Sequence, residues 1–104
     1  MQILIAEDDK LHRAFLHKIT SEALPRLDRI TQADDGRTAL ELFQAGNYES
    51  VILDLQMPKM TGVELARAIW SSKPRTRILF WSNYSDQAYM RGIARIVPDD
   101  GVYG

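Results

Sequence analysis

The sequence predicts an α/β fold with a parallel sheet, and three features of the chain lead to this prediction. Residues 2–6, 29–33, 51–53 and 78–81 have the length and the residue types of short strands. The segments between them carry apolar residues three or four positions apart, as amphipathic helices do. Strands that alternate with helices at this spacing form βαβ units with right-handed crossovers. We therefore expect a doubly wound sheet that is covered on both faces.

The first strand and the first helix are separated only by a short acidic segment. Residues 2–6 are a mainly apolar run that ends at the acidic triplet 7–9. From Lys10 onwards, the apolar residues share one side of a helical wheel: Leu11, Ala14, Phe15, Ile19 and Ala23. This spacing predicts an amphipathic helix that Pro25 closes.

Two further strand–helix units repeat the pattern. After the second strand, the turn 34–36 leads into a helix that ends at 46–47. The third strand runs directly into Asp54, and a loop marked by Pro58 and Gly62 precedes the third helix. Each of these strands is therefore expected to end at the same edge of the sheet.

The last part of the chain carries weaker signals. The fourth strand ends at Ser82, and residues 87–96 are a weak helical candidate because they contain Gly92. The chain shows no internal repeat, linker or low-complexity tract. We therefore expect one domain over residues 1–104.

Composition and charge exclude several classes of protein. Lys and Arg number 13 against 14 Asp and Glu, so the net charge of -1 gives no basic field that would attract nucleic acid or a membrane. The chain has no cysteine, which excludes disulfides, thiolate nucleophiles and cysteine-based metal sites. Acidic residues interrupt the N-terminal apolar run, so it is neither a signal peptide nor a membrane span. We expect a cytoplasmic protein that does not bind nucleic acid or a membrane directly.

Oxygen-bearing side chains follow three of the predicted strands. Glu7 and Asp8 follow the first strand, Asp54 the third and Ser82 the fourth. In open α/β sheets the functional site lies at the carboxyl ends of the strands, so these side chains should share one pocket. Carboxylates gathered there repel each other unless a cation joins them, and Mg²⁺ prefers oxygen ligands. The alternative is that the triplet 7–9 only caps the first helix.

Asp54 is the candidate reactive group. A carboxylate can attack phosphorus and form an aspartyl-phosphate. A divalent cation is needed for this reaction because the nucleophile and the phosphoryl group are both anionic. The cluster therefore predicts magnesium-dependent phosphoryl transfer to Asp54.

The histidines and tryptophans have simpler explanations. His12 and His17 are five positions apart on the first helix and lack the spacing and partners of a metal site, so we expect surface or partner-contact roles. Trp70 and Trp81 are expected to fill a core or its margin.

Three blocks of the sequence resemble the signature blocks of response-regulator receiver domains. They are residues 3–9, 54–62 and 78–86, and the middle block, Asp-x-x-Met-Pro-x-x-x-Gly, is the most specific. The resemblance spans nearly the whole chain. It implies a flavodoxin-like sheet with strand order 2-1-3-4-5.

The resemblance also implies a role for each residue of the site. Asp54 would be the phosphoacceptor and a ligand of Mg²⁺, Asp8 would bind Mg²⁺ directly, and Glu7 would bind it through water. The backbone carbonyl of Gln56 would complete the metal ligands that the protein supplies. Ser82 would supply a switch hydroxyl that binds a phosphoryl oxygen.

Two further residues would border the phosphoryl group. Asn83 and Tyr84 would line its pocket, and in this family Gln56 and Tyr84 stand at positions that tune hydrolysis of the acyl phosphate. A bulky Tyr84 would shield Asp54 from water, so we expect a long-lived phosphorylated state.

The resemblance implies partners as well. The phosphoryl group would come from a sensor histidine kinase or a phosphotransfer protein, which makes the chain a switch and not an enzyme. The third block most resembles receivers that precede a helix-turn-helix output domain, so we expect a role in transcription regulation.

The sequence departs from the family pattern near its C-terminus. Receivers have a fifth strand, a lysine after it that pairs with the phosphoryl group, and a final helix, and we find none of these within residues 1–104. We therefore expect an incomplete receiver domain. Strand 78–81 would then be an exposed edge, so we expect weak stability, or a dimer or other self-association through that edge.

Two other functions remain open from the sequence. One is a magnesium-dependent phosphohydrolase that uses Asp54 as its nucleophile, like the haloacid-dehalogenase-like enzymes. Those enzymes usually have a second aspartate two residues further on, where this chain has Gln56. The other is a receiver-like interaction module that is not phosphorylated, which the missing lysine favours.

Overall fold

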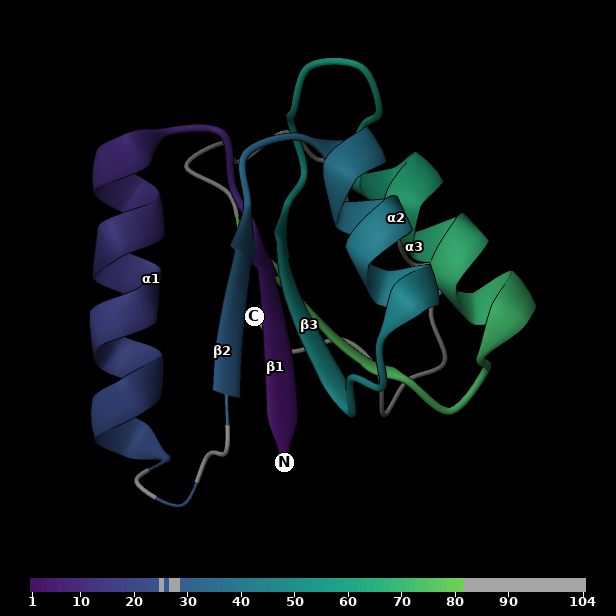
Figure 1. Ribbon diagram of the computed structural model, residues 1–104. Helices are drawn as coiled ribbons and strands as arrows, with labels where there is room; N and C mark the ends of the chain where they lie inside the picture. Colours follow the sequence, from purple (N-terminus) through teal and green to yellow (C-terminus); the bar gives the residue numbers. More distant parts are fainter. Residues whose placement is uncertain (25, 27–28, 82–104) are drawn as a thin grey trace.

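The computed structural model describes residues 1–24, 26 and 29–81, which form a parallel sheet with helices on both faces (Figure 1). The order of the strands in the sheet is β2-β1-β3-β4. The strands are β1 (Gln2–Ala6), β2 (Arg29–Ala33), β3 (Ser50–Asp54) and β4 (Arg77–Trp81). This confirms the predicted α/β fold and the positions of its first four strands. The helical candidate 87–96 lies outside the described residues.

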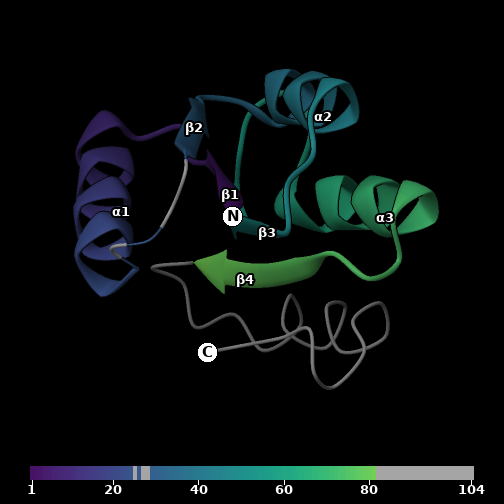
Figure 2. The same ribbon diagram turned by 60° about the horizontal axis from the view of Figure 1, so that its bottom comes forward.

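Three helices connect the strands: α1 (Lys10–Ala23), α2 (Gly36–Ala45) and α3 (Gly62–Ser72). Figures 1 and 2 show α1 on one face of the sheet and the pair of α2 and α3 on the other. This two-sided covering is the doubly wound arrangement that the sequence predicts. Each of these helices falls short of the length and hydropathy that a membrane crossing requires.

Each helix begins after a capping side chain. The side chain of Asp9 accepts a hydrogen bond from the backbone N–H of His12 at 3.0 Å, and Asp35 accepts one from Thr38 at 2.8 Å. Thr61 caps α3 in the same way. A capping oxygen pairs one of the N–H groups that an α-helix leaves free at its start. Within the acidic triplet, Asp9 is therefore the residue that caps α1. The carboxylates of Glu7 and Asp8 are available for another role.

The side chains of β1 alternate between two hydrophobic cores. Leu4 and Ala6 belong to the larger core, which the sheet forms with α2 and α3. Ile3 and Ile5 belong to the smaller core and pack with Leu16 of α1. Because both sets are buried, β1 is an apolar strand covered on both faces, as its sequence predicts.

The buried face of α1 differs from the apolar side predicted for it. Leu11, Phe15 and Ile19 are 80%, 50% and 40% exposed, whereas Leu16 and Thr20 are buried. The helix thus contacts the sheet through a narrow stripe with i, i+4 spacing. The hydrophobic pattern alone identified the helix correctly but not the stripe that it buries.

Candidate functional site

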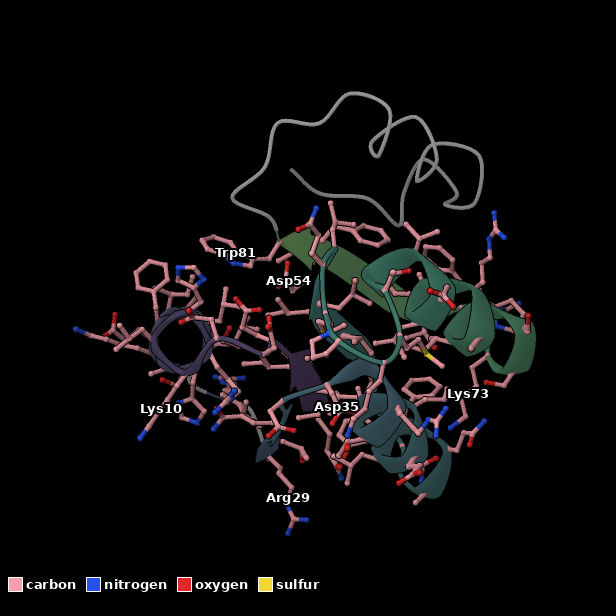
Figure 3. The ribbon with its side chains drawn as sticks, turned by 90° about the horizontal axis from the view of Figure 1, so that it is seen from above. Lys10, Arg29, Asp35, Asp54, Lys73 and Trp81 are labelled. Carbon is pink, nitrogen blue, oxygen red and sulfur yellow. The ribbon has the colours of Figure 1, made fainter. Side chains whose placement is uncertain are left out.

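The parallel pairing of β1, β3 and β4 brings their carboxyl ends to one edge of the sheet. Ala6 of β1 is in register with Leu53 of β3, so Glu7 and Asp54 follow at neighbouring positions. Asp54 is in turn in register with Trp81 of β4. Figure 3 looks onto this edge and shows Asp54 and Trp81 next to each other.

Three carboxylates gather at this edge, as the sequence predicts. Glu7, Asp8 and Asp54 each offer one oxygen, and these oxygens lie within 4.8 Å of one another. Glu7 is only 1% exposed, Asp54 is half-buried and Asp8 is exposed. Oε2 of Glu7 is buried and has no hydrogen-bond partner among the described residues. A buried carboxylate oxygen of this kind needs a cation or a proton, so the site fits a hard divalent ion such as Mg²⁺.

Without a cation, the charges in this cluster disfavour full ionisation. The pKa of Glu7 is raised to about 8, first by burial and then by the close approach and negative charge of the Asp54 carboxylate and the negative charge of Asp8. Burial also raises the pKa of Asp54, although the nearby Glu7 carboxyl and the hydrogen bond from the Gln56 N–H oppose that rise. Close carboxylates share protons in this way when nothing neutralises them. A bound cation would offset the repulsion between the carboxylates and favour their ionised forms.

The loop after Asp54 is held close to the reactive carboxylate. The backbone N–H of Gln56 donates to Asp54 Oδ1 at 3.2 Å, and the N–H of Gly62 donates to the carbonyl of Leu55 at 2.9 Å. A Cβ atom at Gly62 would collide with the backbone carbonyl of Asp54. The last glycine of the Asp-x-x-Met-Pro-x-x-x-Gly block is therefore required by the close approach of α3 to β3.

The same loop is tied to the start of α2. Lys59 adopts a positive φ of 71°, and its Nζ lies 3.6 Å from Oδ2 of Asp35. A Cβ atom at Gly36 would lie 2.5 Å from the carbonyl oxygen of Met60. The loop and the α2 N-terminus therefore pack against each other. No local sequence pattern links Asp35 to Lys59, so this role of Asp35 could not be predicted from the sequence.

A pocket of about 450 Å³ opens beside this loop. Its lining consists of Asp8, Gln56, Met57, Pro58 and Thr61. Met57 is buried in the larger core and anchors the loop. The pocket lies next to the acidic cluster, because Asp8 belongs to both.

His12 lies closer to the acidic cluster than the sequence indicated. Its Nδ1 is 3.2 Å from Oε1 of Glu7, and its side chain is 40% exposed. Next to it, Arg13 Nη1 donates to the backbone carbonyl of Glu7 at 2.8 Å. His12 lies on the first helical turn after the triplet, and this position in the sequence could have been used to predict its contact with Glu7.

Three residues predicted for the site lie outside the described residues. They are Ser82, Asn83 and Tyr84. The switch hydroxyl and the lining of the phosphoryl pocket therefore stay predictions, as does the contribution of the Gln56 carbonyl.

Comparisons with known proteins agree with this geometry. A family model described as the response regulator receiver domain matches residues 3–99. An uncharacterized response regulatory protein of Vibrio cholerae is 32% identical over 85 residues, which cover 82% of this chain and 33% of that protein. The response regulator receiver protein CpdR of Brucella abortus is 34% identical over 84 residues, covering 81% of this chain and 68% of CpdR.

The solved structures agree with the sequence relatives. A two-component transcriptional regulator, AraC from Clostridium phytofermentans, is 37% identical and superimposes with a TM-score of 0.76. The match covers 88% of this chain and 73% of that one. The chain spans only 33% of the length of the Vibrio cholerae protein. Because the family model covers nearly all of the sequence, the chain belongs to the response regulator receiver domain family.

Proposed function

We propose that Asp54 accepts a phosphoryl group in a magnesium-dependent reaction, and that this modification switches the output surface of the receiver. The observation that carries the proposal is the convergence of Glu7, Asp8 and Asp54, with one oxygen of each within 4.8 Å of the others. Family membership supports the same assignment.

The chemistry assigns a separate task to each carboxylate. An oxygen of Asp54 attacks phosphorus and forms the acyl-phosphate bond, while the bond from phosphorus to the donor breaks. The Gln56 N–H, which donates to Asp54 Oδ1, fixes the orientation of the attacking group. Glu7 and Asp8 would hold the cation, with the Gln56 carbonyl as a further ligand. A Mg²⁺ ion in this site supplies positive charge that offsets repulsion between the carboxylate and the phosphoryl oxygens.

The proposal extends to residues and partners beyond the described part of the chain. Ser82 would bind a phosphoryl oxygen, Asn83 would line the pocket, and Tyr84 would shield the acyl phosphate from water. The donor would be a sensor histidine kinase or a phosphotransfer protein in the cytoplasm. A helix-turn-helix output domain would give the receiver a role in transcription, and the match to a two-component transcriptional regulator supports that role.

Incubation of the protein with acetyl phosphate and Mg²⁺, followed by intact-mass analysis, tests this function. We expect one phosphoryl adduct, which disappears in Asp54→Asn and when a chelator removes the metal. Asp34→Asn is the matched control, because Asp34 is an exposed aspartate outside the acidic cluster. Turnover of added phosphate esters would favour a phosphohydrolase, and an adduct that persists in Asp54→Asn would contradict the assignment.

A further inference from the structure

His12 and Trp81 border the acidic site on the side of α1. Nδ1 of His12 lies 3.2 Å from Oε1 of Glu7, which is buried. The ring of His12 meets the ring of Trp81 edge to face, with centroids 6.1 Å apart and an interplanar angle of 68°. The proposed phosphoryl transfer uses neither of these side chains.

The backbone on both sides of this contact is fixed. The backbone N–H of His12 donates to Asp9 Oδ1 at 3.0 Å, so His12 occupies a set position on the first turn of α1. Arg13 Nη1 donates to the carbonyl of Glu7 at 2.8 Å and holds the end of β1 against the same turn. The short distance between His12 and Glu7 therefore follows from the local backbone geometry.

Trp81 is fixed from the side of β4. Its backbone carbonyl accepts a hydrogen bond from Leu55, the residue after Asp54, at 3.1 Å. Its ring contacts both His12 and Phe15, with a centroid distance of 6.2 Å to Phe15. The Trp81 ring thus packs against the His12 ring. Contacts run from Asp54 through β4 to Trp81, on to His12, and back to Glu7.

The two oxygens of Glu7 have different surroundings. Oε1 faces Nδ1 of His12, whereas Oε2 is buried and has no hydrogen-bond partner among the residues described. A ring N–H that donates to a carboxylate orients that carboxylate, and such outer partners of a metal site affect its affinity for the ion. Oε2 is therefore the oxygen left for a cation.

We propose that His12 is a positioning residue for the metal site. Its Nδ1–H holds Oε1 of Glu7, so that Oε2 is presented to the ion or to a water bound to it, and Trp81 keeps the His12 ring in place. This inference rests on the proposed Mg²⁺ site and adds two residues to it that the signature blocks do not assign to metal binding.

Calorimetric titration of the protein with magnesium chloride tests the inference. We expect His12→Leu to weaken Mg²⁺ binding about tenfold, because leucine fills similar space without a donor. His12→Asn should stay within about threefold of the unchanged protein, because its amide nitrogen lies close to the position of Nδ1. His17→Leu is the control, since His17 lies on the same helix and is not part of the acidic cluster.

Tryptophan fluorescence gives a second readout. The chain has two tryptophans, so Trp70→Phe leaves Trp81 as the reporter. We expect Mg²⁺ to change Trp81 emission when residue 12 is His, and to change it much less in the His12→Leu variant.

The outcomes separate the inference from the proposed function. If the unchanged protein binds no Mg²⁺, the proposed function fails. If it binds Mg²⁺ and His12→Leu binds equally well, the positioning role of His12 is wrong while the metal site stands. Equal weakening by His12→Leu and His12→Asn would also overturn it, because the donor would then not be what matters.

Discussion

At the scale of single residues, the charge state of Glu7 links metal binding to pH. Its pKa is raised from 4.5 to about 8 in the metal-free protein, chiefly by burial. The folded state therefore binds this proton more tightly than the unfolded state does. Folding stability from this group is fully present below the unfolded pKa and is lost as the pH rises towards about 8.

Mg²⁺ should consequently stabilise the protein more at high pH than at low pH. The ion displaces the Glu7 proton, so the rise in melting temperature on adding Mg²⁺ should be larger at about pH 8 than at about pH 6. Thermal melts at both pH values measure this. Glu7→Gln should remove most of the difference between them, and a rise in melting temperature that is the same at both pH values would contradict the account.

Gly62 provides a second test at the residue scale. In Gly62→Ala, the added methyl group would collide with the backbone carbonyl of Asp54, so we expect a loss of roughly 1–3 kcal/mol in the free energy of unfolding. Denaturant unfolding measures the loss. Gly46→Ala is the matched control, because its Cβ would meet mainly the movable ring of Tyr48 and should cost less. A Gly62→Ala protein as stable as the parent would mean that α3 does not approach β3 so closely.

The carboxylates of the site were predicted from the sequence, but the side chains that contact them were not. Glu7, Asp8 and Asp54 could be predicted because each directly follows or ends a buried strand, and parallel strands end at one edge. The contact of His12 with Trp81 could not, because it joins α1 to the far end of β4 and leaves no local pattern.

At the scale of elements, hydrophobic periodicity predicted the positions of the helices and strands well. Strand 29–33 has the bounds that its pattern indicated, while β3 and β4 each begin one residue earlier, at Ser50 and Arg77. Periodicity could not identify the buried stripe of α1, because apolar residues occur on two adjacent stripes of this helix. Which stripe is buried depends on how the helix rests on the sheet.

Two alanine substitutions distinguish these stripes. Leu16→Ala should lower the free energy of unfolding by roughly 2–5 kcal/mol, because Leu16 packs with Ile3, Ile5 and Ile52 in the smaller core. Leu11→Ala should change it by less than about 0.5 kcal/mol, because Leu11 is 80% exposed. Chemical denaturation of both variants measures the difference. A larger loss of stability in Leu11→Ala than in Leu16→Ala would mean that the predicted apolar side of α1 is the buried one.

At the scale of the whole molecule, the described helices cover the two faces of the sheet unequally. Two helices and a large buried cluster cover one face, whereas α1 and the four buried residues of the smaller core lie on the other. A hollow of about 500 Å³ lies between α1 and the sheet, with Ile3, Leu16 and Leu79 in its lining. Most of the described core therefore lies on the side of α2 and α3.

The position of β4 bears on self-association. In the part of the chain that the structure describes, β4 lies at an edge of the sheet and pairs with β3. An apolar strand at an edge is open to pairing with another chain, so the described strands predict concentration-dependent self-association through β4. Sedimentation velocity over a range of concentrations measures this. A monodisperse monomer that melts cooperatively would show that the edge is protected.

The central claim is that Glu7, Asp8 and Asp54 together form one divalent-cation site around the phosphoacceptor. Calorimetric Mg²⁺ titration of Asp8→Asn, with Asp34→Asn as the control, tests it most directly. We predict that the parent protein binds one Mg²⁺ ion per chain. Asp8→Asn should bind it at least about tenfold more weakly, and Asp34→Asn should bind it with unchanged affinity. Equal Mg²⁺ affinity in both variants and the parent protein would contradict the claim.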